Sequence, residues 1–98
     1  MAKLESKFQK ELIDEIKREY PGCIILKNDP DYIQGFPDWT ILWEDKWAVL
    51  ECKKNASAKK QPNQTYYVNK MNRMSFAAFI YPENKEEVLY ELQRAFQA

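Results

Sequence analysis

The sequence predicts an α/β fold in which helices flank a central mixed sheet, with elements in the order α-β-β-β-α-β-α. Three observations support this prediction. Apolar residues recur at helical spacing near both ends of the chain, and two aromatic-rich runs in the middle are typical of a β-hairpin. A further apolar run then lies between two helical segments. With 98 residues, 45% of them hydrophobic, we expect one folded domain over residues 1–98.

A helix is predicted over about Lys3–Tyr20, and the pair Pro21-Gly22 ends it. Glu5 lies near the middle of the apolar stripe of this helix. An acid in a first helical turn is commonly only a favourable charge near the helix N-terminus, so a structural role is the alternative to a functional one. The apolar residues of the stripe recur at every fourth position: Leu4, Phe8, Leu12, Ile16 and Tyr20.

Three strands are predicted next. Residues 23–27 (CIILK) form a short run that we expect to be a buried strand, and the turn-forming residues Asn28-Asp29-Pro30-Asp31 follow it. The runs Trp39–Trp43 and Trp47–Leu50 are joined by the polar residues Glu44-Asp45-Lys46, a pattern that predicts a hairpin.

The register of this hairpin decides which charged residues meet. If Glu44 and Asp45 are the two turn residues, then Trp43 pairs with Lys46, Thr40 with Val49, and Asp38 with Glu51. Directly opposed residues have Cβ atoms about 4.5–5.5 Å apart, so the two carboxylates would share one cation. A hard divalent cation such as Mg²⁺ would remove their repulsion. Lys53 lies on the same strand face as Glu51.

The second half of the chain begins with a polar loop, after which Pro62 is well placed to start a helix ending near Arg73. Gln64 lies in its first turn, where a surface polar residue is the alternative to a functional one. Residues 75–81 (SFAAFIY) predict a fourth strand, and an amphipathic helix is predicted over Glu83–Phe96, with Val88, Leu89, Leu92 and Phe96 facing inward.

Composition excludes several classes of protein. The absence of histidine excludes His-ligated zinc and Ser-His or Cys-His catalysis. There is no signal-peptide pattern and no long apolar run, so we expect a cytoplasmic protein whose two cysteines are reduced. Net charge is zero, yet residues 52–82 carry basic side chains and no acidic ones. This segment is either a phosphate-facing surface or a solvated basic helix face. Its basic residues are Lys53, Lys54, Lys59, Lys60, Lys70 and Arg73.

These residues together resemble the PD-(D/E)xK nuclease superfamily. Pro37-Asp38 followed by Glu51-Cys52-Lys53 is similar to the signature of that family, which also carries it on a hairpin. Glu5 resembles the glutamate that several subfamilies place in the preceding helix. Gln64 resembles the glutamine found in the VRR-NUC and archaeal Holliday-junction resolvase branches. The similarity covers about residues 4–81, and the size of the chain resembles stand-alone phage-encoded members.

The resemblance implies a restriction-endonuclease-like core and metal-assisted hydrolysis of phosphodiester bonds. Asp38 and Glu51 would hold Mg²⁺, or Mn²⁺ in its place, helped by Glu5 and the backbone carbonyl of Cys52. Lys53 would orient the attacking water and offset the charge of the transition state, and Gln64 would position the phosphate or the lysine. The basic residues expected to bind DNA are Lys54, Lys59, Lys60, Lys70 and Arg73.

The sequence indicates the class of substrate less specifically than it indicates the reaction. No base-reading motif is present, so we expect recognition of DNA shape, such as a Holliday junction or other branched DNA. So small a unit offers little surface for two strands, which favours a homodimer. Two alternatives stay open: a sequence-specific nicking or restriction-type endonuclease, and a catalytically silent nuclease fold that binds DNA or a partner protein.

Overall fold

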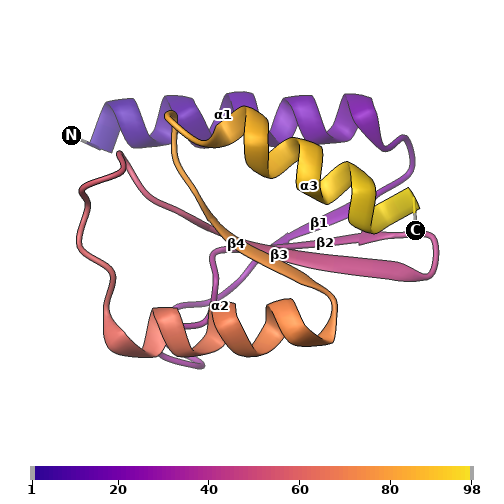
Figure 1. The fold of residues 1–98 in the computed structure, drawn as a ribbon. Helices are drawn as coiled ribbons and strands as arrows, with labels where there is room; N and C mark the ends of the chain where they lie inside the picture. Colours follow the sequence, from indigo (N-terminus) through magenta and orange to yellow (C-terminus); the bar gives the residue numbers. More distant parts are fainter. Residues whose placement is uncertain (1, 98) are drawn as a thin grey trace.

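The structure is a computed structural model that describes the backbone of residues 2–97 and the side chains of residues 6–97. Within that range the chain forms three helices and four strands in the predicted order (Figure 1). The predicted α/β fold with a central mixed sheet is confirmed, and the ends of its elements differ from the predicted ones by at most two residues. The elements are α1 Ala2–Glu19, β1 Ile24–Lys27, β2 Trp39–Trp43, β3 Lys46–Cys52, α2 Pro62–Met74, β4 Phe76–Ile80 and α3 Lys85–Gln97.

The four strands form one sheet in the order β1-β2-β3-β4. The pairs β1–β2 and β2–β3 are antiparallel, whereas β3 and β4 are parallel. A parallel connection needs a crossover, and α2 provides it. Figure 1 shows α2 on one face of the sheet and both α1 and α3 on the other. The end of β3 and the start of α2 therefore lie at the same end of the sheet.

The central strand β3 is buried on both faces, and its alternate residues face opposite helix layers. Ala48, Leu50 and Cys52 belong to the core formed with α1 and α3. Val49 packs with Val68 of α2 in a second, smaller core. Because side chains alternate along a strand, Glu51 lies on the face of Val49. It is the one charged side chain that is buried in the described part of the chain.

The hairpin has the predicted register. Trp43 pairs with Lys46, and Thr40 pairs with Val49. Glu44 adopts the left-handed conformation that the tight turn requires, with φ of 56°. Asp38 comes directly before β2, so that continuing the ladder places it opposite Glu51.

The prediction that residues 23–27 form a buried strand is wrong. β1 lies at the edge of the sheet, and the side chains of Ile24 and Leu26 are 57% and 46% exposed. The physical reason is that α2 is the helix on one face of the sheet and packs against β3 and β4. It leaves the half of that face formed by β1 and β2 uncovered. No helix in the described range is long and apolar enough to cross a membrane.

The loop between β1 and β2 approaches the start of α2 through Gly35. A Cβ atom at this position would lie 2.7 Å from the Asn63 side chain, and φ is +88°. The Asn63 side-chain amide also donates a hydrogen bond to the carbonyl of Gln34, with a length of 3.2 Å. The loop that leads into Asp38 is thereby held against α2.

Replacing Gly35 by alanine is therefore expected to destabilise the fold for two reasons: alanine is strained in a left-handed backbone conformation, and its Cβ would clash with Asn63. The backbone strain alone costs roughly 1–2 kcal/mol. Gly22→Ala is the matched control, because Gly22 has φ of +86° but no atom within 4 Å of the added Cβ. Urea unfolding should give a larger loss of free energy for Gly35→Ala than for Gly22→Ala. Equal losses would contradict the close approach.

Candidate active site

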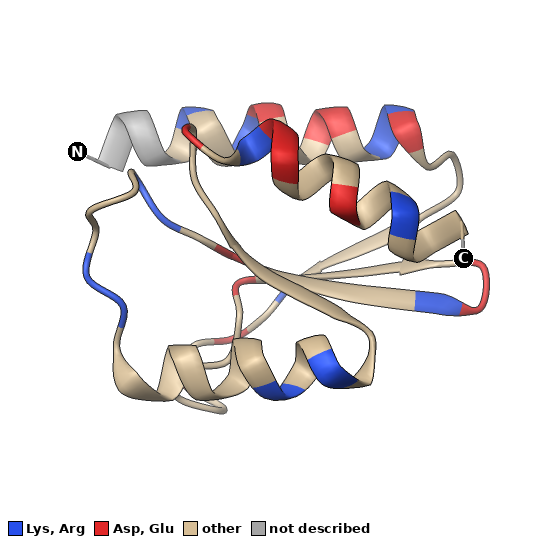
Figure 2. Cartoon of the chain, in the orientation of Figure 1, with Lys and Arg blue, Asp and Glu red and all other residues tan. Residues whose placement is uncertain are grey.

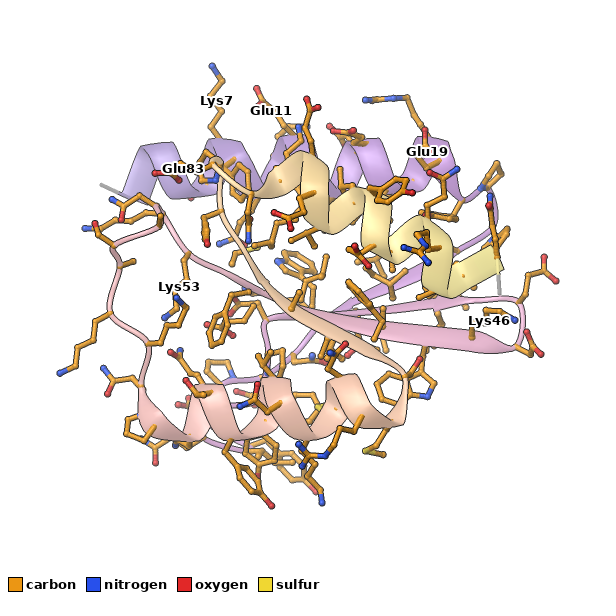
Figure 3. The ribbon with its side chains drawn as sticks, viewed as in Figure 1. Lys7, Glu11, Glu19, Lys46, Lys53 and Glu83 are labelled. Atoms are coloured by element: carbon orange, nitrogen blue, oxygen red, sulfur yellow. The ribbon has the colours of Figure 1, made fainter. Side chains whose placement is uncertain are left out.

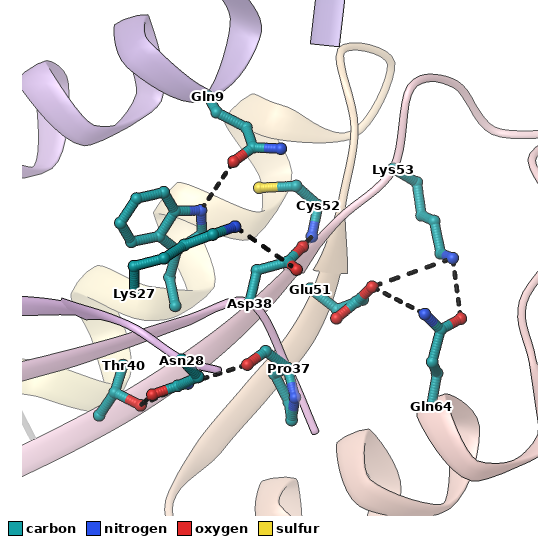
Figure 4. Close-up of polar contacts among 11 residues, drawn as sticks. Gln9, Lys27, Asn28, Pro37, Asp38, Thr40, Glu51, Cys52, Lys53 and Gln64 are labelled. Atoms are coloured by element: carbon teal, nitrogen blue, oxygen red, sulfur yellow. Dashed lines mark hydrogen bonds and ion pairs between the residues drawn. The ribbon is translucent and has the colours of Figure 1, made fainter. Parts of the chain in front are cut away.

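Four side chains from three segments converge on one open cavity of about 400 Å³ (Figure 4). Asp38 comes from the start of the hairpin, Glu51 and Lys53 from the end of β3, and Gln64 from the first turn of α2. Figure 3 shows Lys53 between the segment that follows β3 and the first turn of α2. The sheet register and the crossover helix are what bring these residues together.

The Asp38 carboxylate is fixed by two groups. One oxygen, Oδ2, accepts a hydrogen bond of 2.9 Å from the backbone N–H of Cys52. The other, Oδ1, lies 3.7 Å from the Nζ of Lys27. The backbone is held as well, because the Asn28 side chain donates to the carbonyl of Pro37 and to the hydroxyl of Thr40. Asp38 is thus oriented toward β3.

The Glu51 carboxylate is 5% exposed and sits among charges of both signs. Burial, and after it the nearby charge of Asp38, raise its pKa from 4.5 to about 7, against the opposing effect of the positive charges of Lys53 and Lys27. Its Oε2 atom accepts a hydrogen bond of 3.0 Å from Gln64 and lies 3.9 Å from the Nζ of Lys53. A cation bound beside this carboxyl group would favour its ionised form and so offset the effect of burial.

Gln64 connects Glu51 of β3 with Lys53, which follows that strand. Its Nε2 donates to Glu51, while its Oε1 accepts from the Nζ of Lys53 at 2.8 Å. The same Oε1 accepts from the backbone N–H of Gln61 at 2.9 Å, which caps the start of α2. The helix start and the two charged side chains are therefore held by one amide group.

The residues present fit a hard divalent cation. Mg²⁺ is commonly bound by one or two carboxylates together with water and substrate phosphates, and Asp38 and Glu51 supply such a pair on one cavity. No group of three or more His, Cys, Asp or Glu side chains that could hold a metal occurs among the described residues. The predicted third carboxylate, Glu5, lies in α1, but its side chain is outside the described residues. The thiol of Cys52 packs in the core with α1 and α3, so only the backbone of this residue is near the cavity.

The predicted DNA-binding residues occupy three places. Lys54 and Lys59 line the cavity beside Lys53. The ammonium group of Lys60 lies over the rings of Phe79 and Tyr81, at 5.1 and 5.8 Å from their centroids. Lys70 and Arg73 are exposed in the second half of α2, away from its start. Figure 2 shows acidic residues along α1 and α3 and only basic ones on α2. The structure thus brings Lys54 and Lys59 to the cavity and leaves the other three apart from it.

Sequence reasoning missed Lys27. This side chain is half-exposed, pairs with Asp38, and lies over the ring of Trp39 at 4.7 Å from its centroid. Trp39 is in turn held by a hydrogen bond from its Nε1 to the side chain of Gln9 in α1, 3.1 Å long. The pairing of β1 with β2 places Lys27 opposite Trp39, one residue from Asp38. That pairing is the signal that would have found Lys27, and it was not predicted.

Comparisons with protein-family models, with characterised proteins and with solved structures return no match to this chain. The candidate site therefore stands on its own residues and on their arrangement.

Proposed function

We propose that this protein is a metal-dependent endonuclease that hydrolyses phosphodiester bonds in DNA. One observation carries the proposal: two carboxylates, a lysine and a glutamine meet at one cavity, with a network of hydrogen bonds and charges among them. The nearby loop adds Lys54 and Lys59 and no acidic residue. Such a cavity fits an anionic substrate that arrives with a cation.

Each residue has a role in this reaction. Asp38 and Glu51 would hold Mg²⁺ or Mn²⁺, which would supply polarisation of the phosphate and a lower pKa for a bound water. Lys53 orients the attacking water and offsets negative charge that develops on the phosphate oxygens. Gln64 keeps Lys53 and Glu51 at the same place through its amide. Lys54 and Lys59 hold the phosphates of the flanking nucleotides.

We propose a branched DNA substrate and a homodimer for the same enzyme. The described residues include no base-reading motif, which favours recognition of shape. The dimer is supported by the exposed apolar strip of Ile24 and Leu26 on the edge strand β1 and Leu42 on the neighbouring β2. Such a strip beside an open strand edge is suited to a second copy.

The test is cleavage of a labelled four-way junction and of a linear duplex of matching sequence, each with Mg²⁺, Mn²⁺ or EDTA. We expect cutting of the junction with either metal, no cutting in EDTA, and no cutting by the Asp38→Ala variant. Equal cutting of junction and duplex would remove the preference for branches, and one discrete cut in the duplex would indicate a restriction-type enzyme. If the protein binds the junction but cuts it with neither metal, the proposed nuclease function would be overturned. Light scattering on the same samples tests the dimer.

A further inference from the structure

Four aromatic side chains lie on the loop that leads into Asp38 and in the first half of α2, next to the candidate active site. The ring of Phe36 lies 5.7 Å from that of Tyr67, which lies 5.1 Å from that of Tyr66 (distances between centroids). Phe36 and Tyr32 also line one cavity of about 390 Å³, together with Asn28, Asp29 and Ile33. We call Tyr32, Phe36, Tyr66 and Tyr67 the aromatic surface.

The aromatic surface is close to the proposed site of cleavage. Phe36 is two residues from Asp38, so their Cα atoms lie within about 7 Å of each other. Tyr67 is three residues after Gln64 in α2, and residues three apart are neighbours on a helix surface. The loop and the helix that carry the two ends of this surface therefore also carry two residues of the candidate active site.

Two of the four rings do not serve the core. Tyr32 and Tyr66 are 83% and 56% exposed, and neither belongs to the buried hydrophobic core of the described residues. Phe36 and Tyr67 are partly buried and join the loop to α2. The partly buried ring of Tyr67 packs against the exposed ring of Tyr66, and the partly buried Phe36 lines one cavity with the exposed Tyr32. This is the arrangement on which nucleobases stack.

Charge separates the aromatic surface from the phosphate-binding part of the site. Lys53, Lys54 and Lys59 line the candidate active site. The loop of Tyr32 carries Asp29 and Asp31 instead, and Asp29 lines the apolar cavity. These carboxylates repel a phosphate, whereas a carboxylate accepts hydrogen bonds from the amino groups of bases. The aromatic surface therefore fits bases, and the lysines fit the backbone of the same strand.

We propose that the aromatic surface stacks unpaired nucleobases of the strand that is cut, so that the preferred substrate carries unpaired nucleotides next to the scissile bond. The proposal rests on the proposed nuclease function and narrows its substrate class. Base faces inside a duplex are covered by their neighbours and offer nothing to Tyr32 and Tyr66. A strand with unpaired bases offers both a face for each ring and a phosphate for the lysines.

The experiment measures binding in EDTA, where no metal-dependent cleavage occurs, by fluorescence anisotropy. The probes are a duplex with a short thymidine flap, the same duplex with an abasic flap, and a blunt duplex. The variants are the double substitution Tyr32→Ala/Tyr66→Ala and its conservative form Tyr32→Phe/Tyr66→Phe. Tyr90→Ala is the matched control, because Tyr90 is a similarly exposed tyrosine (58%) on α3, across the sheet from α2. The single variant Tyr32→Ala is included because so exposed a ring contributes little to the fold.

The wild type should bind the thymidine flap more tightly than the abasic flap. The double alanine variant should lose this preference, with affinity for the thymidine flap lowered by roughly 5- to 150-fold for each base that stacks. The double phenylalanine variant and Tyr90→Ala should behave as the wild type. If the double alanine variant lost affinity equally for all three probes, or lost none for the thymidine flap, the proposal would be overturned. If the protein prefers the thymidine flap but shows no nuclease activity, the stacking proposal would be supported and only the proposed nuclease function would be overturned.

Discussion

Replacing Glu51 by glutamine is expected to stabilise the protein at pH 8 and to lower its cleavage activity on the order of 10³-fold. The side chain is buried, and its pKa is raised from 4.5 to about 7 by burial and by the charge of Asp38. The folded state therefore favours the protonated form. Below pH 4.5 Glu51 is protonated in both the folded and unfolded states, and the favourable contribution is fully present. As the pH rises from 4.5 through 7 that contribution is lost.

The size of this loss follows from the pKa difference. A pKa difference of 1 between the folded and unfolded states is worth 1.36 kcal/mol. The change in pKa from 4.5 to about 7 therefore corresponds to roughly 3 kcal/mol. Glutamine has the same shape, keeps an oxygen for the hydrogen bond from Gln64, and does not ionise. The free energy of unfolding of Glu51→Gln should therefore exceed that of the wild type at pH 8 and approach it near pH 5.

The measurement is urea unfolding from pH 5 to pH 8 in EDTA. Glu87→Gln is the matched control, since it makes the same chemical change at an exposed residue of α3. Parallel curves for Glu51→Gln and the wild type would contradict the buried, destabilised carboxylate. Mg²⁺ should then raise the stability of the wild type at pH 8 and leave Glu51→Gln unchanged, because binding to the folded state alone stabilises it. Cleavage should fall on the order of 10³-fold, since metal stabilisation of the transition state is worth several kcal/mol.

Replacing Lys53 by alanine is expected to lower kcat by about 10²–10³-fold with a smaller change in KM. An interaction that forms with charge developing in the transition state contributes on this scale. The Lys53 side chain is 14% exposed, and Gln64 holds its ammonium group at 2.8 Å, so the group is oriented before substrate arrives. Removing it also takes away the charge that most lowers the pKa of Glu51.

Two controls separate this role from general attraction of DNA. Lys59→Ala removes a more exposed lysine of the same cavity and should raise KM more than it lowers kcat. Lys17→Ala removes an exposed lysine of α1 and should leave both constants unchanged. Steady-state kinetics on the junction measure kcat and KM for the three variants. An equal fall in kcat for Lys53→Ala and Lys59→Ala would show that Lys53 acts only as one charge among several.

The hairpin shows what local sequence determines. Polar residues at Glu44-Asp45 and apolar residues on either side set the turn, and the turn sets the register of every pair between Trp39 and Leu50. Since a strand alternates faces, the register also puts Glu51 and Lys53 on one side of the sheet. The pairing of Asp38 with Glu51 follows from neighbouring residues alone, which is why the sequence predicts it.

The position of β1 shows what local sequence does not determine. Residues 23–27 are as apolar as a central strand, but Ile24 and Leu26 are exposed because α2 lies over the other half of the sheet. Lys27 reaches Asp38 only because β1 pairs with β2. Every charged residue between 54 and 73 is basic, yet Lys54 and Lys59 reach the cavity while Lys70 and Arg73 stay on the far half of α2.

By itself, the sequence determined the elements, the register of the hairpin, and the shared face of Glu51 and Lys53. It did so because periodicity and turn chemistry act between residues close in the chain. Only the tertiary structure decided that Lys27 joins Asp38, that the Gln64 amide spans Lys53 and Glu51, and that the Cys52 thiol turns into the core. These contacts depend on which elements become neighbours when the sheet and helices pack, and no local pattern contains that choice.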